Sequence, residues 1–139
     1  MSQRARDVNK RIQSPINLDK TIRAPPSKPV VKFGTVEKAE FENLGTTVEV
    51  VLSAGTVKFR QKEYVLQQFH FHTPSEHRIE LEYFSLEIHF VYKAANNATL
   101  VLGALFELTK DGSTTALLTV LAASLDEITE PGSVTETGH

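Results

Sequence analysis

The sequence predicts a mainly β domain with one helix, on three observations. From Val30 onward, short runs rich in β-branched and aromatic residues alternate with turn residues, as in a series of strands. Only the segment 113–128 carries apolar residues at helical spacing. The first 29 residues hold four of the six prolines, and proline fixes φ and removes a backbone donor, so no long helix is expected there.

Length and composition fit one domain. The chain has 139 residues, 40% of them hydrophobic and 23% charged, which is enough for a single core. We therefore predict one domain over 1–139, with 1–11 as a loosely ordered N-terminal arm. The absence of cysteine excludes disulfides and cysteine zinc sites.

The sequence gives little support for a membrane span, a secretory signal or nucleic-acid binding. No apolar run approaches the ~20 residues of a membrane helix, and 1–11 has no apolar core for a secretory signal. The compartment stays open: cytoplasmic by default, secreted or periplasmic for a processed chain. Seven basic and two acidic residues spread over 1–29 without an aromatic residue indicate a solvated surface, so we expect no nucleic-acid binding.

The expected strands follow one another from Val30 to Leu108. Turns are predicted at 53–55, before the fourth strand, and at 61–62, before the fifth. The predicted strands are 30–33, 36–43, 46–52, 56–60, 63–72, 83–92 and 100–108. The last of these is almost wholly apolar, which is typical of a strand buried on both faces.

The helix is predicted over 113–128. Its apolar stripe recurs at intervals of four, four and three residues, at Leu117, Leu121, Leu125 and Ile128. Ser113 or Asp111 is the expected N-cap, and Pro131 with Gly132 ends the segment. Residues 133–139 are not expected to form a folded element, and His139 is expected to be inert.

The strand 63–72 carries the first chemical signal. Side chains alternate between the faces of a strand, so Gln68, His70 and His72 share one face and Phe69 and Phe71 the other. The two imidazoles can therefore reach one point.

A third imidazole comes from the strand 83–92, which is able to pair with 63–72. His89 and Glu87 share a face of that strand. Three neutral imidazoles suit zinc and leave a fourth tetrahedral position for water, as in catalytic rather than structural zinc sites. The sequence therefore predicts a zinc site at His70, His72 and His89.

Polar neighbours support this site. Metal-bound imidazoles usually donate their second N–H to a polar partner, and Gln68 and Glu87 each lie two residues before a ligand histidine. Glu76 is better placed to orient a hydroxyl than to bind metal. His77 is interpreted as a structural hydrogen-bonding residue.

A rival interpretation uses the same residues. The pattern His70-x-His72-x-x-x-Glu76 resembles the first motif of the cupins, which bind iron or manganese through three histidines and a glutamate. Tyr83 stands where the cupin glycine would fall, and no P-x-G precedes His89. These departures favour zinc.

Longer motifs bring a family resemblance. The segments 13–18 (QSPINL), 68–77 (QFHFHTPSEH) and 87–91 (EIHFV) resemble the α-class carbonic anhydrases. The run Thr-Pro-Ser-Glu-His at 73–77 is closest to the bacterial and fungal branch. The resemblance extends from about Ile12 to Gly138, nearly the whole chain.

The resemblance implies a large, twisted, mostly antiparallel sheet with zinc at the bottom of a cone-shaped cleft. It implies reversible hydration of carbon dioxide to bicarbonate and a proton, with inhibition by sulfonamides or anions. By position, His70, His72 and His89 match the zinc ligands, and Gln68 and Glu87 their hydrogen-bonding partners. Glu76 matches the glutamate that orients the hydroxide through a threonine. The residues that match the apolar wall for carbon dioxide are Val91 and Val101.

Two departures from the family pattern are visible. Thr46 stands where the family usually has a proton-shuttle histidine, and threonine does not titrate near neutrality. The family's C-terminal portion, with its gatekeeper threonine, has no counterpart after Val134–Gly138. An unpaired edge at 100–108 would then favour a homo-oligomer. The alternative to an enzyme is a catalytically silent zinc-binding module of the same fold.

Overall fold

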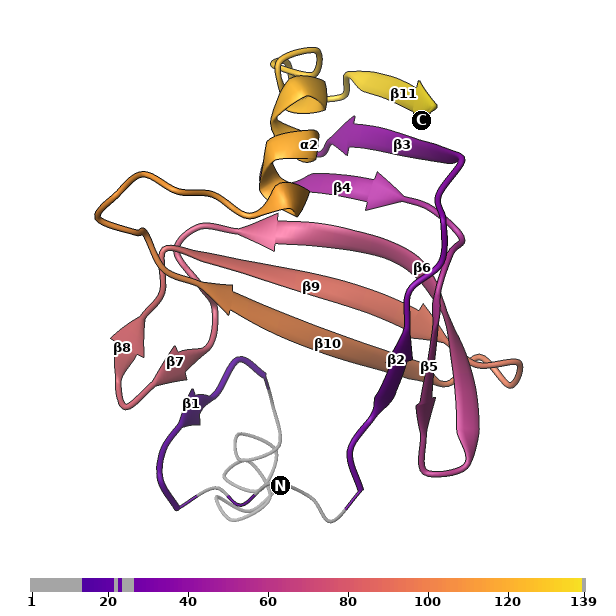
Figure 1. Cartoon of the computed structure of the whole chain (residues 1–139), viewed down its shortest axis with the longest axis vertical. Coiled ribbons are helices and arrows are strands. Elements are labelled where there is room, and N and C mark those ends of the chain that lie inside the picture. The colour runs from indigo at the N-terminus through magenta and orange to yellow at the C-terminus, as the bar shows by residue number, and fades with distance from the viewer. Residues whose placement is uncertain (1–13, 22, 24–26, 139) are drawn as a thin grey trace, which may run out of the picture.

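The structure of the protein, a computed structural model, describes residues 14–21, 23 and 27–138. A twisted sheet with strand order β10-β9-β6-β4-β3-β11 forms its centre, and every neighbouring pair is antiparallel (Figure 1). The strands are β3 Lys38–Asn43, β4 Val48–Val51, β6 Lys62–His72, β9 Leu86–Lys93, β10 Thr99–Phe106 and β11 Val134–Gly138. The predicted mainly β class with a mostly antiparallel sheet is confirmed.

Strand β6 is long enough to pair with two partners on one side. Its first half pairs with β5 (Thr56–Phe59), which pairs in turn with β2 (Val30–Lys32), and its second half pairs with β4. The β5–β6 turn lies on Arg60 and Gln61, one residue earlier than predicted, and both have positive φ (47° and 63°). Two such residues match the right-handed twist of the flanking strands.

A small second sheet ties the N-terminal segment to the loop after β6. Strand β1 (Asn17–Leu18) pairs in parallel with β7 (Arg78–Ile79), and β7 pairs with β8 (Glu82–Tyr83). Figure 1 shows these strands at one end of the main sheet. Strands β1 and β7 were not predicted, since two residues are too few for a visible alternation. The predicted strand 83–92 is divided in the structure, with Tyr83 in β8 and the rest of the strand beginning at Leu86 in β9.

The register divides the main sheet into two faces. On the histidine face, one row crosses five strands through Glu42, Glu49, His70, His89 and Gly103. On the apolar face, the adjacent row runs through Phe41, Val50, Phe69, Phe90 and Leu102. The predicted alternation in β6 and β9 therefore places the histidines and the phenylalanines on opposite faces of the sheet.

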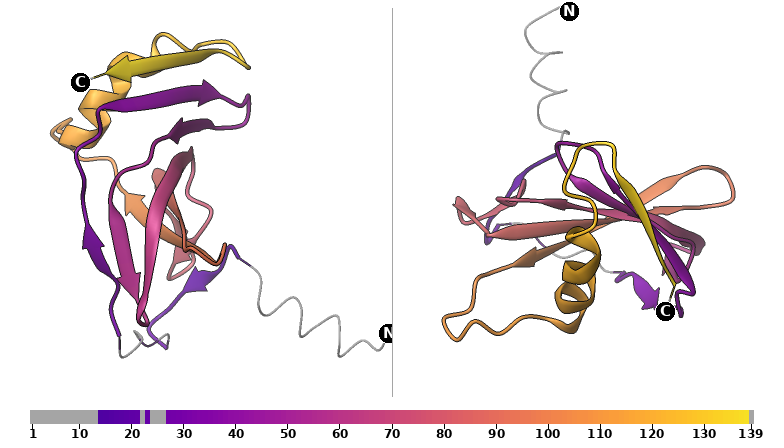
Figure 2. Two further views of the ribbon diagram at one scale, coloured as in Figure 1. Left: turned by 90° about the vertical axis from the view of Figure 1, so that its right-hand side faces the viewer. Right: turned by 90° about the horizontal axis from the view of Figure 1, so that it is seen from above.

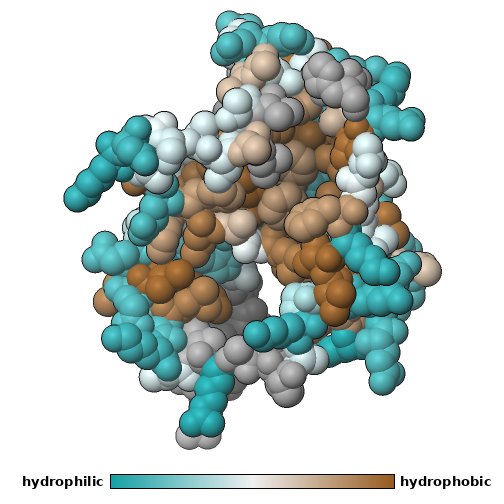
Figure 3. Space-filling view, in the orientation of Figure 1, coloured by the Kyte–Doolittle hydropathy of each residue, from teal (hydrophilic) through white to brown (hydrophobic). Residues whose placement is uncertain are grey.

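The apolar face carries the helix. Helix α2 (Ala116–Leu125) lies to one side of the sheet (Figure 2), and Leu121 on it is buried. Leu118 and Leu121 share a hollow of about 490 Å³ with Phe71 and Leu86 of the apolar face. Figure 3 shows apolar residues gathered over the middle of this face.

Helix α2 is shorter than predicted. It begins after Thr115, whose hydroxyl accepts a hydrogen bond from the Leu118 N–H at 3.3 Å, so neither Ser113 nor Asp111 is the N-cap. Asp111 instead accepts from the Ser113 N–H in the preceding turn. Ile128 is buried beyond the end of the helix, and Leu125 is 37% exposed.

Two expectations about the ends of the sheet are wrong. Residues 134–138, expected to be unstructured, form β11, because a non-local partner, β3, supplies their hydrogen bonds. Strand β10 is not buried on both faces. In the described part of the chain only β9 pairs with it, and Val101 is 49% exposed.

The described residues contain no helix long and apolar enough to cross a membrane. The predicted arm, 1–11, lies outside the described residues, and a single domain over 1–139 stays a prediction.

Candidate metal centre

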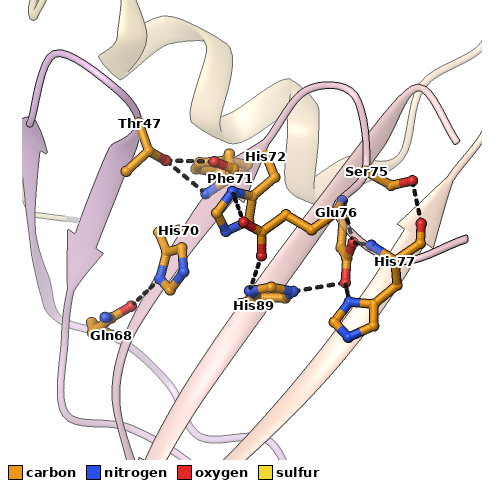
Figure 4. Close-up of polar contacts among 10 residues, drawn as sticks. Thr47, Gln68, His70, Phe71, His72, Ser75, Glu76, His77 and His89 are labelled. Atoms are coloured by element: carbon orange, nitrogen blue, oxygen red, sulfur yellow. Dashed lines mark hydrogen bonds and ion pairs between the residues drawn. The ribbon is translucent and has the colours of Figure 1, made fainter. Parts of the chain in front are cut away.

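Strands β6 and β9 bring three imidazoles together. His70 lies directly opposite His89 in the antiparallel register, and His72 lies two residues further along β6 on the same face. One ligand nitrogen from each ring lies within 4.8 Å of the other two. The structure thus assembles the three histidines that the sequence analysis singled out (Figure 4).

Hydrogen bonds select the nitrogen that each ring presents. His70 Nδ1 lies 2.9 Å from Gln68 Oε1, and His89 Nε2 lies 2.7 Å from Glu87 Oε1. Each contact holds the ring nitrogen that donates its N–H and leaves the lone pair of the other nitrogen available to a metal, Nε2 on His70 and Nδ1 on His89. Gln68 and Glu87 therefore take the orienting positions expected of them.

The third ring carries an unusual feature. Nε2 of His72 is buried and has no hydrogen-bond partner among the described residues. A buried polar atom without a partner destabilises a fold by about 1–3 kcal/mol unless something binds it. Three imidazoles, one of them with an unsatisfied buried nitrogen, are a donor set that fits Zn²⁺.

Glu87 is the centre of the polar network behind the histidines. Its Oε2 accepts from the N–H groups of Glu76 (2.8 Å) and His77 (2.9 Å). Its Oε1 lies 2.7 Å from both His77 Nδ1 and His89 Nε2. His77 was predicted to be a structural hydrogen-bonding residue, and in the structure its partner is Glu87.

This network also governs the charge of Glu87, which is 1% exposed. Burial alone would raise the pKa of its carboxyl. The hydrogen bonds from the His77 backbone and from the His89 and His77 rings outweigh burial, and the pKa of Glu87 falls from 4.5 to about 2. The carboxylate is therefore ionised at neutral pH.

A second combination of three residues could also hold a metal in principle. His77, Glu87 and His89 have ligand atoms within 4.8 Å of one another. However, both oxygens of Glu87 already accept two hydrogen bonds each. We therefore interpret this group as the support of the first site rather than as a second one.

Glu76 reaches over the site from the loop after β6. Its carboxylate lies 3.6 Å from His72 Nδ1 and 3.9 Å from His89 Nδ1 (Figure 4). Burial, followed by the charges of His72 and His89, lowers the pKa of His70, and the charge of Glu76 partly offsets this. The environment therefore favours the neutral, ligating form of the His70 imidazole.

The remaining predicted residues lie around the histidines. Val91 and Val101 are opposite each other on β9 and β10, one row from His70 and His89 on the same face. Val101 and His89 line a cleft of about 550 Å³, together with Glu76. Thr46 is exposed and lines the hollow of about 490 Å³ beside α2, which His72 also lines.

Sequence reasoning missed three supporting residues. Thr47 exchanges hydrogen bonds with the backbone of Phe71 between the two ligands of β6. Ser75, which is buried, bonds the backbones of His77 and Phe84 and so fixes the loop that carries Glu76. Gly103 lies opposite His89. Only Ser75 had a sequence signal, since it belongs to the segment 73–77.

A mainly antiparallel sheet with three converging imidazoles defines the class as a β protein with a candidate metal centre. The sequence profile described as "Eukaryotic-type carbonic anhydrase" matches residues 2–138. The chain belongs to this family, the α class of the resemblance.

Individual relatives agree with this assignment. A carbonic anhydrase from Pectobacterium atrosepticum is 40% identical over 98 residues, which is 68% of this chain and 39% of the relative. The structure of a fungal α-carbonic anhydrase from Aspergillus oryzae has a TM-score of 0.82 and 37% identity over 91% of this chain and 54% of its own. A Thermovibrio ammonificans α-carbonic anhydrase in complex with sulfanilamide has a TM-score of 0.75 and 32% identity, over 88% of this chain and 53% of its own.

The coverage is unequal in all three comparisons. This chain spans about half the length of the solved structures and about two fifths of the Pectobacterium protein. The bacterial and fungal relatives confirm the branch that the sequence motif indicated. Activity, substrate and partners are taken up below as proposals.

Proposed function

We propose that this chain is a zinc-dependent carbonic anhydrase that hydrates carbon dioxide reversibly to bicarbonate and a proton. The observation that carries the proposal is the convergence of His70, His72 and His89, each on one rigid sheet. Zinc bound there would lower the pKa of a bound water to about 7 and so make hydroxide available at neutral pH.

The chain's own residues prepare the ligands. Gln68 and Glu87 hold His70 and His89 in one tautomer and one orientation, which supports a preorganised donor set. The unpartnered Nε2 of His72 supplies the third donor.

Other residues act on substrate and proton. The paired side chains of Val91 and Val101 offer carbon dioxide an apolar surface beside His89, where a linear, uncharged molecule needs no hydrogen bond. Glu76 would orient the attacking hydroxide indirectly, by accepting a hydrogen bond from the hydroxyl of a threonine, as the family resemblance implies. Because Thr46 does not titrate near neutrality, protons leave through water or buffer.

A second candidate function is a catalytically silent zinc-binding module of the same fold. It is favoured by Thr46, which stands where the family usually has a proton-shuttle histidine. Both candidates require the same three histidines, so metal binding does not distinguish them.

The distinguishing experiment is the stopped-flow rate of carbon dioxide hydration per bound zinc, with His70→Ala as the control. A zinc-dependent rate well above the control supports the enzyme. Stoichiometric zinc with a rate equal to the control supports the silent module and overturns our proposal.

Two partner proposals accompany the enzyme. Sulfonamide or anion inhibitors would bind at the zinc, which is supported by the sulfanilamide complex of the Thermovibrio relative. We also propose a homo-oligomer. In the described chain β10 has a partner on one side only, and such edges can pair with another chain.

A further inference from the structure

Gly103 occupies a position where its backbone gives no reason for glycine. It lies in the middle of β10, directly opposite His89. Its φ is outside the left-handed region that only glycine adopts easily, unlike those of Gly45, Gly55, Gly112 and Gly132. Glycine inside a strand weakens it and often marks a close approach by another group.

The approaching group is the carboxylate of Glu87. A Cβ atom on residue 103 would lie 3.2 Å from Glu87 Oε1, which is tighter than nine in ten Cβ contacts in proteins, so the carboxylate would have to give by a few tenths of an ångström. It would also lie 3.7 Å from Cδ2 and 4.0 Å from Nε2 of His89. The atoms that a side chain would meet are therefore the acceptor and the ring that it orients.

Glu87 cannot easily move away from such a side chain. Oε2 is held by two backbone N–H groups, those of Glu76 and His77. Oε1 is held at 2.7 Å by the rings of His77 and His89. Displacing Oε1 by a few tenths of an ångström therefore lengthens or bends the hydrogen bond that sets the orientation of His89.

We propose that Gly103 is a positioning residue for the metal centre: its missing side chain leaves the space in which the Glu87 carboxylate lies against β10 and holds His89. This inference rests on the proposed function, since it concerns the same metal site. Gly103 touches no substrate and acts through Glu87, and it also lines the cleft that contains His89.

The test uses Co²⁺, which substitutes for zinc and whose visible absorption reports the ligand geometry. Co²⁺ affinity, measured by competition with a chelator, and the visible spectrum are recorded for the wild type, Gly103→Ala, Glu87→Ala and the double variant. Ala104→Ser is the matched control, because residue 104 is the next on the strand and pairs with Ile88 on the apolar face.

We expect Gly103→Ala to weaken Co²⁺ binding by roughly 10-fold or more, as for loss of an outer hydrogen-bond partner, and to change the spectrum. Ala104→Ser should leave both unchanged. In the Glu87→Ala background, where the space is vacated, adding the methyl group should cost no further affinity.

Three outcomes would overturn the inference. The first is unchanged affinity and spectrum in Gly103→Ala. The second is an equal loss on adding the methyl group with and without the Glu87 carboxylate. If Gly103→Ala does not fold, the double variant should recover folding by circular dichroism, and its failure to do so is the third. A wild type that binds no Co²⁺ overturns the metal centre itself, which separates the two failures.

Discussion

Oε1 of Glu87 lies 2.7 Å from Nε2 of His89, two residues further along β9. This contact decides which nitrogen of His89 remains available, because the ring donates to Glu87 through Nε2 and keeps Nδ1 free. On β6, Gln68 holds the opposite nitrogen, Nδ1, of His70. On both strands the hydrogen-bonding partner lies two residues before the histidine. The nitrogen left available is nevertheless Nε2 in His70 and Nδ1 in His89.

Removing a histidine ligand should weaken zinc binding more than removing a residue that only orients a ligand. Gln68→Ala should weaken zinc binding about 10–100-fold, because it frees His70 to rotate. His89→Ala removes a ligand and should weaken binding more than that. Isothermal titration or chelator competition measures both. His139→Ala serves as the control histidine, and equal affinities for His89→Ala and His139→Ala would contradict the assignment.

Stability should depend on acid through Glu87. Because its folded pKa, about 2, lies below the usual 4.5, the ionised carboxylate stabilises the fold fully above about pH 4.5. This contribution, on the order of 3 kcal/mol, is lost as the pH falls toward 2. Urea unfolding of metal-free protein should show a steeper loss over this range than Glu87→Gln shows. The exposed Glu82→Gln should behave like the wild type, and parallel curves for all three would refute the prediction.

The apolar wall should affect turnover without affecting metal binding. Val101→Phe places a ring beside Val91 and should reduce the hydration rate by roughly 10²-fold, as expected when a substrate is misplaced by about 1 Å. Zinc affinity should not change, since no ligand or partner moves. Stopped-flow rates normalised to bound zinc test this, with Val101→Ala as the control that keeps the wall open. A rate in Val101→Phe equal to the wild type would remove Val101 from the substrate pocket.

Proton export should be limiting in this chain. Thr46→His introduces a group that titrates near neutrality at the exposed rim of the hollow that reaches His72. In dilute buffer we expect the rate to rise about 10-fold or more, and the dependence on buffer concentration to become weaker. Thr46→Asn is a polar control that does not titrate. Identical buffer dependence in the two variants would show that Thr46 does not lie on the proton path.

The side of β10 that has no partner strand among the described residues should promote self-association. Sedimentation equilibrium at micromolar concentration is expected to show a dimer or a larger species. Residues 1–29 hold seven basic and two acidic residues, and residues 107–139 hold one basic and six acidic residues. Strand pairing and apolar contact should persist at 1 M salt, where the Debye length is about 3 Å and attraction between these two segments is screened. A clean monomer at both salt concentrations contradicts the proposal, and dissociation by salt alone assigns the contact to charge.

The sequence by itself determined the local features of this protein. Alternation with period two placed Gln68, His70 and His72 on one face of β6 and the phenylalanines on the other, because successive side chains of a strand point to opposite faces. The same rule placed Glu87 with His89. The strand class, the helix within 113–128 and the family followed from patterns and motifs within short windows.

The tertiary structure decided what depends on pairing between distant segments. The register that sets His70 opposite His89 also sets Gly103 beside Glu87, and neither can be read from one strand alone. Strand β11 exists because β3 offers it hydrogen bonds, and β10 is exposed because the described chain supplies it with one neighbour. Side-chain alternation is fixed by backbone geometry, whereas register and edge exposure are set by which strands meet.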